Sequence, residues 1–159
     1  GGAAVNIIPD RITQEIQIRA KTPEAIMDAS MKVDRAARGG AMAMGAAVEI
    51  ETVPGYMPLR NNAVFADYYS RNVKILNPNA DFFCCGHRGS STDMGELSQI
   101  MPVFHPYAAG FSGGHHTCDF KVSDPYKAYV EPAKLLAMTA LDFMSGDAAV
   151  LKEVLKEKL

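Results

Sequence analysis

The alternation of apolar and polar residues between positions 12 and 20, interrupted only at Gln14, constrains the fold more than any other feature of the chain. Four apolar side chains share one face of such a segment: Ile12, Ile16, Ile18 and Ala20. A period of two residues predicts a β-strand that is packed on one face and open on the other. A short run rich in strand-forming residues, 4–8, precedes it across a Pro–Asp turn. The two segments therefore predict a β-hairpin.

The residues after this hairpin carry the signals of a capped helix. Thr22 is the predicted N-cap, Pro23 takes the first helical position and Glu24 lies in the first turn. Gly45 suits the position just past the end of such a helix. The glycine pair at 39–40 marks either a kink or a close approach between the helix and a sheet.

Strand and helix patterns alternate through the rest of the chain. We expect strands at 46–53, 81–86 and 101–109, and helices at 63–76, 124–146 and 147–159. The segment 54–62 is rich in Pro, Gly and Asn and predicts a boundary. The expected fold class is α/β, with an α+β first lobe, and the expected lobes are residues 1–61 and 62–159.

The composition argues against several functional classes. A net charge of −2 provides no attraction to nucleic acid or to an anionic membrane. No apolar run reaches the roughly 20 residues that a membrane span needs. The three cysteines, of which Cys84 and Cys85 are adjacent, do not make a disulfide framework, so we expect a reducing, cytoplasmic setting. The apolar run around this pair predicts that both thiols are buried in the core.

Side chains that ligate metals gather in the segment SGGHHTCDF, residues 112–120. His115, His116, Cys118 and Asp119 fall within five residues. A neutral imidazole binds Zn²⁺, Mn²⁺ or Co²⁺, but a metal site needs three or four ligands. The remaining two of the four histidines are His87 and His105, and no HxxxH, HExxH or CxxC spacing is present. The segment is therefore either a metal-binding loop or a polar surface turn.

Two further groups suit a carboxylate-bearing ligand. The small residues of GSSTDMGE, 89–96, expose backbone N–H groups, and Asp93 can orient a histidine or a substrate amine. The alternative is a short helix containing residues 94–98 and capped by Ser91 or Thr92. Arg19 lies on the open face of the predicted hairpin, where a guanidinium binds a carboxylate in bidentate fashion, and Asn6 is expected to face the same way. A lone strand arginine is otherwise a solvated surface residue.

Four segments together resemble the metal-dependent amidohydrolases, a family that includes aminoacylases, hippurate hydrolases, p-aminobenzoyl-glutamate hydrolase and glutamate-releasing carboxypeptidases. In chain order they are GGAAVNIIPD…IQIRA, GSSTDMGELS, HPYAAG and HHTCDF. The resemblance covers nearly the whole chain. It implies a catalytic α/β domain with a centre of two divalent ions (Zn, Mn or Co) and an inserted domain that forms a homodimer. Residues 1–61 then correspond to the later part of the dimerisation domain, and 62–159 to the C-terminal part of the catalytic domain.

The resemblance also assigns roles to individual residues. Asn6 and Arg19 match the pair that binds the substrate's carboxylate and carbonyl groups. His116 matches the late metal ligand, so His115 is its neighbour and not a ligand, and Asp93 lies in a segment of the substrate cleft. Cys118 departs from the family's usual proline.

The first catalytic half of the family, with its other metal ligands and its general-base glutamate, has no counterpart here. No Glu–Glu pair occurs in the chain. We therefore expect a fragment of a longer hydrolase, inactive alone, whose substrate is an N-acyl amino acid or a small peptide. The alternative is a non-catalytic dimerisation or interaction module. A third hypothesis is a binder of small carboxylates that uses Arg19.

Overall fold

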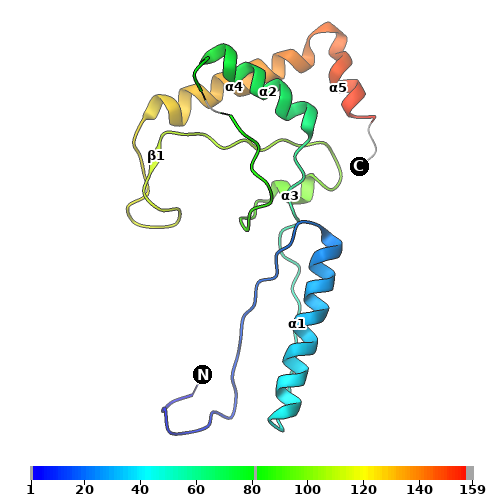
Figure 1. Ribbon diagram of the computed structural model, residues 1–159, viewed down its shortest axis with the longest axis vertical. Coiled ribbons are helices and arrows are strands. Elements are labelled where there is room, and N and C mark those ends of the chain that lie inside the picture. Colours follow the sequence, from blue (N-terminus) through cyan, green and yellow to red (C-terminus); the bar gives the residue numbers. More distant parts are fainter. Residues whose placement is uncertain (1, 81, 157–159) are drawn as a thin grey trace. The chain divides into compact units, whose positions relative to one another are not determined.

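The computed structural model describes residues 2–80 and 82–156, which divide into two compact units, Gly1–Pro54 and Gly55–Leu159. The described residues combine helices with one small two-stranded sheet, a mixed structure compatible with an α/β or an α+β class (Figure 1). The division between the units falls after Pro54, the first residue of the segment 54–62 expected as a boundary, and residues 55–62 belong to the second unit. The dimerisation and catalytic roles of the two lobes stay predictions.

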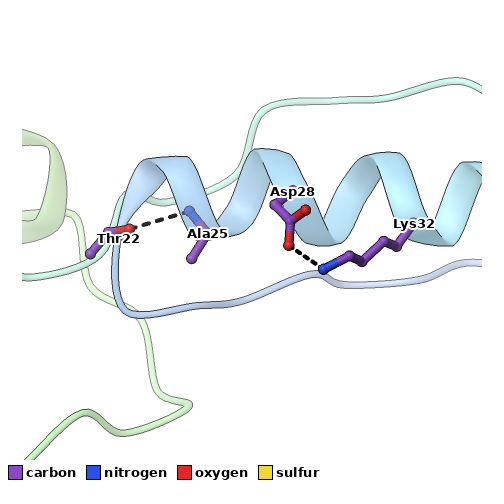
Figure 2. A network of polar contacts seen from close by, with 4 residues as sticks. All are labelled: Thr22, Ala25, Asp28 and Lys32. Carbon is purple, nitrogen blue, oxygen red and sulfur yellow. Dashed lines mark hydrogen bonds and ion pairs between the residues drawn. The ribbon is translucent and has the colours of Figure 1, made fainter.

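Helix α1, Pro23–Ala43, is the regular element of the first unit, and its predicted start is confirmed. The Thr22 side chain accepts a hydrogen bond from the Ala25 N–H at 3.2 Å (Figure 2). One turn further along, Lys32 donates to the Asp28 carboxylate, a pair that Figure 2 also shows. Gly45 has a φ of +64°, as expected just after the C-cap. The glycine pair lies inside a continuous helix, and a Cβ at either position would meet nothing within 4 Å outside the helix's own backbone.

The predicted hairpin is wrong, because the described residues 2–54 contain no β-strand. Asn6 instead lies in a turn that the Ile7 N–H closes onto the Ala4 carbonyl at 3.3 Å. Residues 11–20 and 46–54 have no regular secondary structure. A strand exists only where a neighbouring chain segment completes its ladder, and the alternation of residue types supplies no such neighbour.

The core of the second unit forms between helix α2, Ala63–Leu76, and helix α4, Glu131–Met144, which pack side by side (Figure 1). The buried side chains Tyr69, Val73 and Leu135 make its centre. The Asn72 side chain is buried in the same interface and donates to Thr139 Oγ1 at 3.1 Å and to an Asp142 carboxylate oxygen at 2.7 Å. These polar contacts fix which faces of the two helices meet.

Two short helices follow α4: η2, Gly146–Ala148, and α5, Ala149–Val154. The expected final helix extends to residues 157–159, which lie outside the described residues. A π-helix, η1, Tyr126–Val130, precedes α4, and the Glu131 N–H donates to the Tyr126 carbonyl. Pro132 explains this widened turn, since proline has no N–H for the α-helical bond and its ring crowds the preceding turn.

The strands expected at 81–86 and 101–109 are also absent from the described residues. Residues 82–86 form no strand, and residue 81 lies outside the described part. In the later segment, Val103 makes an isolated parallel bridge with Asn61. The sheet consists of β1, Phe111–Ser112, and β2, Lys121–Val122, paired antiparallel. Among the described residues, no helix combines the length and apolar character needed to cross a bilayer.

Candidate functional site

The histidine segment, residues 112–120, begins with the last residue of β1 and then forms the loop between β1 and β2 (Figure 1). Gly113 opens this loop with a φ of +88°, in the region that favours glycine. A Cβ at this position would lie 2.3 Å from the Asp119 carbonyl oxygen, closer than any side chain tolerates. The two arms of the loop therefore approach each other at a point where a side chain does not fit.

Hydrogen bonds inside the loop hold its shape. The Thr117 N–H and hydroxyl reach the Gly114 carbonyl at 3.2 and 2.6 Å, and the Phe120 N–H donates to the Thr117 carbonyl at 3.3 Å. The Thr117 hydroxyl also contacts the Asp119 carboxylate, and this bond, with smaller contributions from backbone N–H groups, lowers the pKa of Asp119 below its ordinary value. Asp119 is thus engaged within the loop.

Three rings stack along the antiparallel pair of β1 and β2 and the loop between them. Phe111 and Phe120 lie nearly parallel, with centroids 5.4 Å apart, and the His115 imidazole stacks on Phe120 at 5.2 Å. Such offset contacts contribute on the order of 1 kcal/mol each. The His115 ring is therefore engaged with Phe120 within the loop.

His116 differs from His115 in its backbone and in its ring contacts, although both residues are exposed. Its φ of +62° is unusual for a residue with a side chain. A non-glycine residue held in this region costs about 1–2 kcal/mol, and such residues concentrate at binding and catalytic sites. The loop thus keeps one histidine in its ring stack and holds the next in a strained, accessible conformation.

The described residues do not complete a metal site around His116. No group of three or more His, Cys, Asp or Glu residues in the described chain is arranged to hold a metal ion. An exposed imidazole is chemically suitable as one ligand, yet one ligand does not hold a divalent ion. The donor set of the described residues therefore does not fit a two-metal centre by itself.

The other predicted site residues are divided between the two units. Asn6 and Arg19 are exposed residues of the first unit, and no strand pairing in the described residues links them; the Arg19 guanidinium donates to Gln17 Oε1 at 2.8 Å. Asp93 belongs to the second unit, where it directly precedes the short helix α3, Met94–Leu97. Its carboxylate accepts a bond from Thr92 Oγ1 at 3.2 Å, and it is exposed.

The expected helix after the GSSTD segment is confirmed as α3, although Asp93 and not Ser91 or Thr92 takes the N-cap position. The Asp93 side chain makes no capping bond, whereas Thr92 Oγ1 lies 3.4 Å from the Met94 N–H. The helix packs closely on the preceding chain: a Cβ on Gly95 would lie 1.9 Å from the Met57 carbonyl oxygen. The close contact explains why this turn contains a glycine.

The cysteine prediction is wrong, because Cys84 and Cys85 are exposed. Cys118 is exposed and free as well. The Arg88 guanidinium donates to the Cys85 sulfur at 2.9 Å. The apolar residues around the pair suggested burial. Phe82 does pack on Tyr69 of the core, with centroids 5.7 Å apart, but Phe83 remains 73% exposed.

Sequence reasoning gave no role to His105, which the structure singles out. Its Nδ1 is a buried side-chain atom with no hydrogen-bond partner among residues 2–80 and 82–156. The backbone N–H of His105 donates to Asn61 Oδ1 at 2.9 Å. The local signal was the His–Pro dipeptide, because proline provides no N–H to a neighbouring side chain. His87, the fourth histidine, is exposed.

Comparison with known proteins supports a peptidase family for this chain. The chain is similar to the Xaa-Arg dipeptidase of Mus musculus, with 31% identity over 99% of the chain. It is also similar to the Xaa-Arg dipeptidase of Homo sapiens, with 32% identity over 89% of the chain. The aligned parts make up 38% and 34% of these two relatives, so the chain spans well under half of their length.

Two other comparisons gave no match. No protein-family model matches the sequence. No solved structure matches it significantly.

Proposed function

We propose that this chain forms part of a metal-dependent peptidase that hydrolyses the amide bond of a dipeptide or an N-acyl amino acid. The observation that carries the proposal is the similarity of nearly the whole chain to two Xaa-Arg dipeptidases. The positive φ of the exposed His116 also supports it, because strained backbone is frequent at binding and catalytic sites.

In this proposal His116 donates one imidazole nitrogen to a centre of divalent ions, with Zn²⁺, Mn²⁺ or Co²⁺ as the suitable ions. Ions held there would supply a Lewis acid for activating water, and His116 would be one of the residues that hold them. The other ligands and the general base come from residues outside these 159, since the described residues contain no complete ligand group. The chain alone is then inactive, and the complete enzyme is a homodimer in the cytoplasm. The free thiols fit that reducing compartment.

The proposed substrate contacts use groups that recognise a free carboxylate. Arg19 is an exposed guanidinium, which binds a carboxylate through two parallel hydrogen bonds. Asn6 contributes an amide to the carbonyl side, and Asp93 places a carboxylate for the substrate's positive charge. A dipeptide that ends in arginine carries both kinds of group, which is why we choose it as the first substrate to test.

The second candidate is a non-catalytic dimerisation or interaction module. The observation in its favour is the incomplete ligand set of the described chain. A purified 159-residue chain that hydrolyses a dipeptide when supplied with metal would exclude this candidate.

The deciding experiment uses the complete product of the reading frame that contains this sequence. Hydrolysis of glycyl-arginine and of N-acetyl-arginine is followed with Mn²⁺, Zn²⁺ or Co²⁺, before and after treatment with a chelator. We expect activity that chelation abolishes and added metal restores. We expect the His116→Ala variant to bind less metal, whereas His87→Ala, a matched change at an exposed histidine, retains full metal content. Activity that survives chelation, or no hydrolysis with any of these ions, contradicts the proposal.

A further inference from the structure

Two neighbouring thiols are accessible on the second unit. Cys84 and Cys85 are both exposed and free. The residue before this exposed stretch, Phe82, packs on Tyr69 of the core, whereas every residue from 83 to 90 is exposed. The segment is therefore attached to the core through Phe82, and both thiols are open to a reagent in solution.

A guanidinium group lies against the sulfur of Cys85. Arg88 Nη2 donates to this sulfur at 2.9 Å, and Arg88 is itself exposed. A guanidinium has five N–H donors in a planar fork, so one N–H can contact the sulfur while two others bind a carboxylate. Space is available for such a reagent, because a Cβ on Gly86 would meet nothing within 4 Å. Arg88 is therefore placed to bring a carboxylate next to the Cys85 thiol.

The adjacency of the two cysteines determines what kind of disulfide they can form. The peptide bond between them is trans. Consecutive Cα atoms across a trans peptide bond are about 3.8 Å apart, whereas bridged cysteines usually have Cα atoms about 4.4–6.8 Å apart. A disulfide between Cys84 and Cys85 is therefore strained. Strained and exposed disulfides are easily reduced and are typical of reversible redox pairs, not of structural crosslinks.

We propose that Cys84 and Cys85 form a thiol–disulfide exchange site for small disulfides that carry carboxylates, represented by oxidised glutathione. The inference goes beyond the proposed peptidase function and does not depend on it. Three observations support it together: two adjacent free thiols, their exposure, and the Arg88 contact with one of the two sulfur atoms.

The exchange takes place in two steps. While Arg88 binds a carboxylate of the reagent, the Cys85 sulfur gives up its proton and attacks one reagent sulfur. A bond between Cys85 and glutathione forms, the S–S bond of the reagent breaks, and the departing thiolate takes up a proton. The deprotonated sulfur of Cys84 then attacks the Cys85 sulfur, which closes the Cys84–Cys85 disulfide and releases the second glutathione thiol. The two electrons and two protons lost by the pair thus appear in two molecules of reduced glutathione, and an excess of reduced glutathione reverses both steps.

The first test maps the products in the 159-residue chain. After incubation with oxidised glutathione, the remaining thiols are blocked with N-ethylmaleimide and the tryptic peptides are identified by mass spectrometry. Cleavage after Lys74, Arg88 and Lys121 separates peptide 75–88, which holds the pair, from peptide 89–121, which holds the exposed and free Cys118 as an internal control.

We expect peptide 75–88 to carry glutathione on Cys85 first and then to lose two hydrogen atoms without retaining glutathione. Peptide 89–121 should be modified later, and reduced glutathione should restore both thiols of the pair. Glutathione retained on both cysteines, or a Cys118 that reacts as fast as the pair, overturns the inference. In the Cys84→Ser variant the reaction should stop at the mixed disulfide on Cys85.

The second test isolates the contribution of Arg88. In a Cys118→Ser background, the loss of thiols reports the pair alone. We expect Arg88→Gln to react with oxidised glutathione about 3- to 10-fold more slowly, as loss of one charge-assisted contact predicts. The difference should shrink at high salt, because both the contact and the reagent are exposed. Lys152→Gln, which removes the charge of an exposed residue on α5, should react like the parent chain.

A neutral reagent, bis(2-hydroxyethyl) disulfide, distinguishes recognition of a carboxylate from a general effect on the thiol. We expect Arg88→Gln to react with it at nearly the same rate as the parent chain does. An unchanged rate with oxidised glutathione, or equal slowing with both reagents, overturns the inference.

Discussion

Replacing Gly113 with alanine tests whether the histidine loop has the shape described above. An alanine held at a φ of +88° costs about 1–2 kcal/mol. Its Cβ would also lie 2.3 Å from the Asp119 carbonyl oxygen, so the backbone has to move by more than half an ångström to reach an ordinary contact. That movement breaks bonds such as that between the Phe120 N–H and the Thr117 carbonyl, at about 1 kcal/mol each. The total is about 2–4 kcal/mol.

Native-state hydrogen exchange measures this cost at the loop itself. We expect the Phe120 amide to exchange at least about 30-fold faster in Gly113→Ala than in the wild-type chain, as 2 kcal/mol implies. Gly86→Ala is the matched control, because open space surrounds Gly86 and its backbone does not require glycine. Its effect should stay within about 0.5 kcal/mol. If the Gly113 and Gly86 variants exchange alike, the close approach of the two arms of the loop is refuted.

Three further predictions concern the second unit. Gly95→Ala should lower the free energy of unfolding in urea by about 2–4 kcal/mol, because its Cβ would collide with the Met57 carbonyl oxygen at 1.9 Å; unchanged stability contradicts that contact. Thr117→Val should return the pKa of Asp119 upward toward its usual value of 3.8, as followed by carboxyl NMR. Since the folded-state pKa is the lower one, the stabilisation of the loop should be present at neutral pH and be lost as the pH falls through that pKa. Burial, with a smaller contribution from a nearby carboxylate, raises the pKa of Tyr69, so stability should decrease as the pH rises past about 10, and Tyr69→Phe should remove that decrease.

Helix α1 shows which part of the fold a sequence reveals directly. Its start depends on Thr22 and Pro23, and its end on Gly45, and all three act through bonds or backbone angles within a few residues. Such local effects are visible in a sequence because the interacting groups are also neighbours along the chain. The short helix after the GSSTD segment was predictable for the same reason.

The core contacts of the second unit depend on distant residues and were not predictable in this way. In the sequence, Asn72 is an ordinary polar residue of an amphipathic helix. In the structure it is 3% exposed and donates hydrogen bonds to Thr139 and Asp142, about 70 positions away. The bond from His105 to Asn61 likewise joins residues 44 positions apart. Nothing in the local sequence distinguishes these side chains from solvated ones, because the partner determines the role.

The candidate site was predictable only in part. The side chains in SGGHHTCDF indicated ligand chemistry, and the structure adds the difference between its two histidines. That difference arises from the backbone angle at His116 and from the ring of Phe120 behind His115. The angle in turn depends on the closed loop that Gly113 permits. The arrangement could not be derived from residue types alone, because it depends on three-dimensional closure.

The period-two pattern of the first unit shows that the burial of side chains and the pairing of a strand are different questions. Ile18 and Ala20 are partly buried while Arg19 between them is exposed. Ile12 and Ile16, predicted for the same packed face, are 66% and 52% exposed. The pattern therefore predicted the side chains that turn away from water only in the second half of the segment. It failed for the ladder, because backbone pairing requires a second segment in register. A sequence pattern of this kind therefore specifies a face that is to be covered, and the identity of the covering segment has to come from elsewhere in the folded protein.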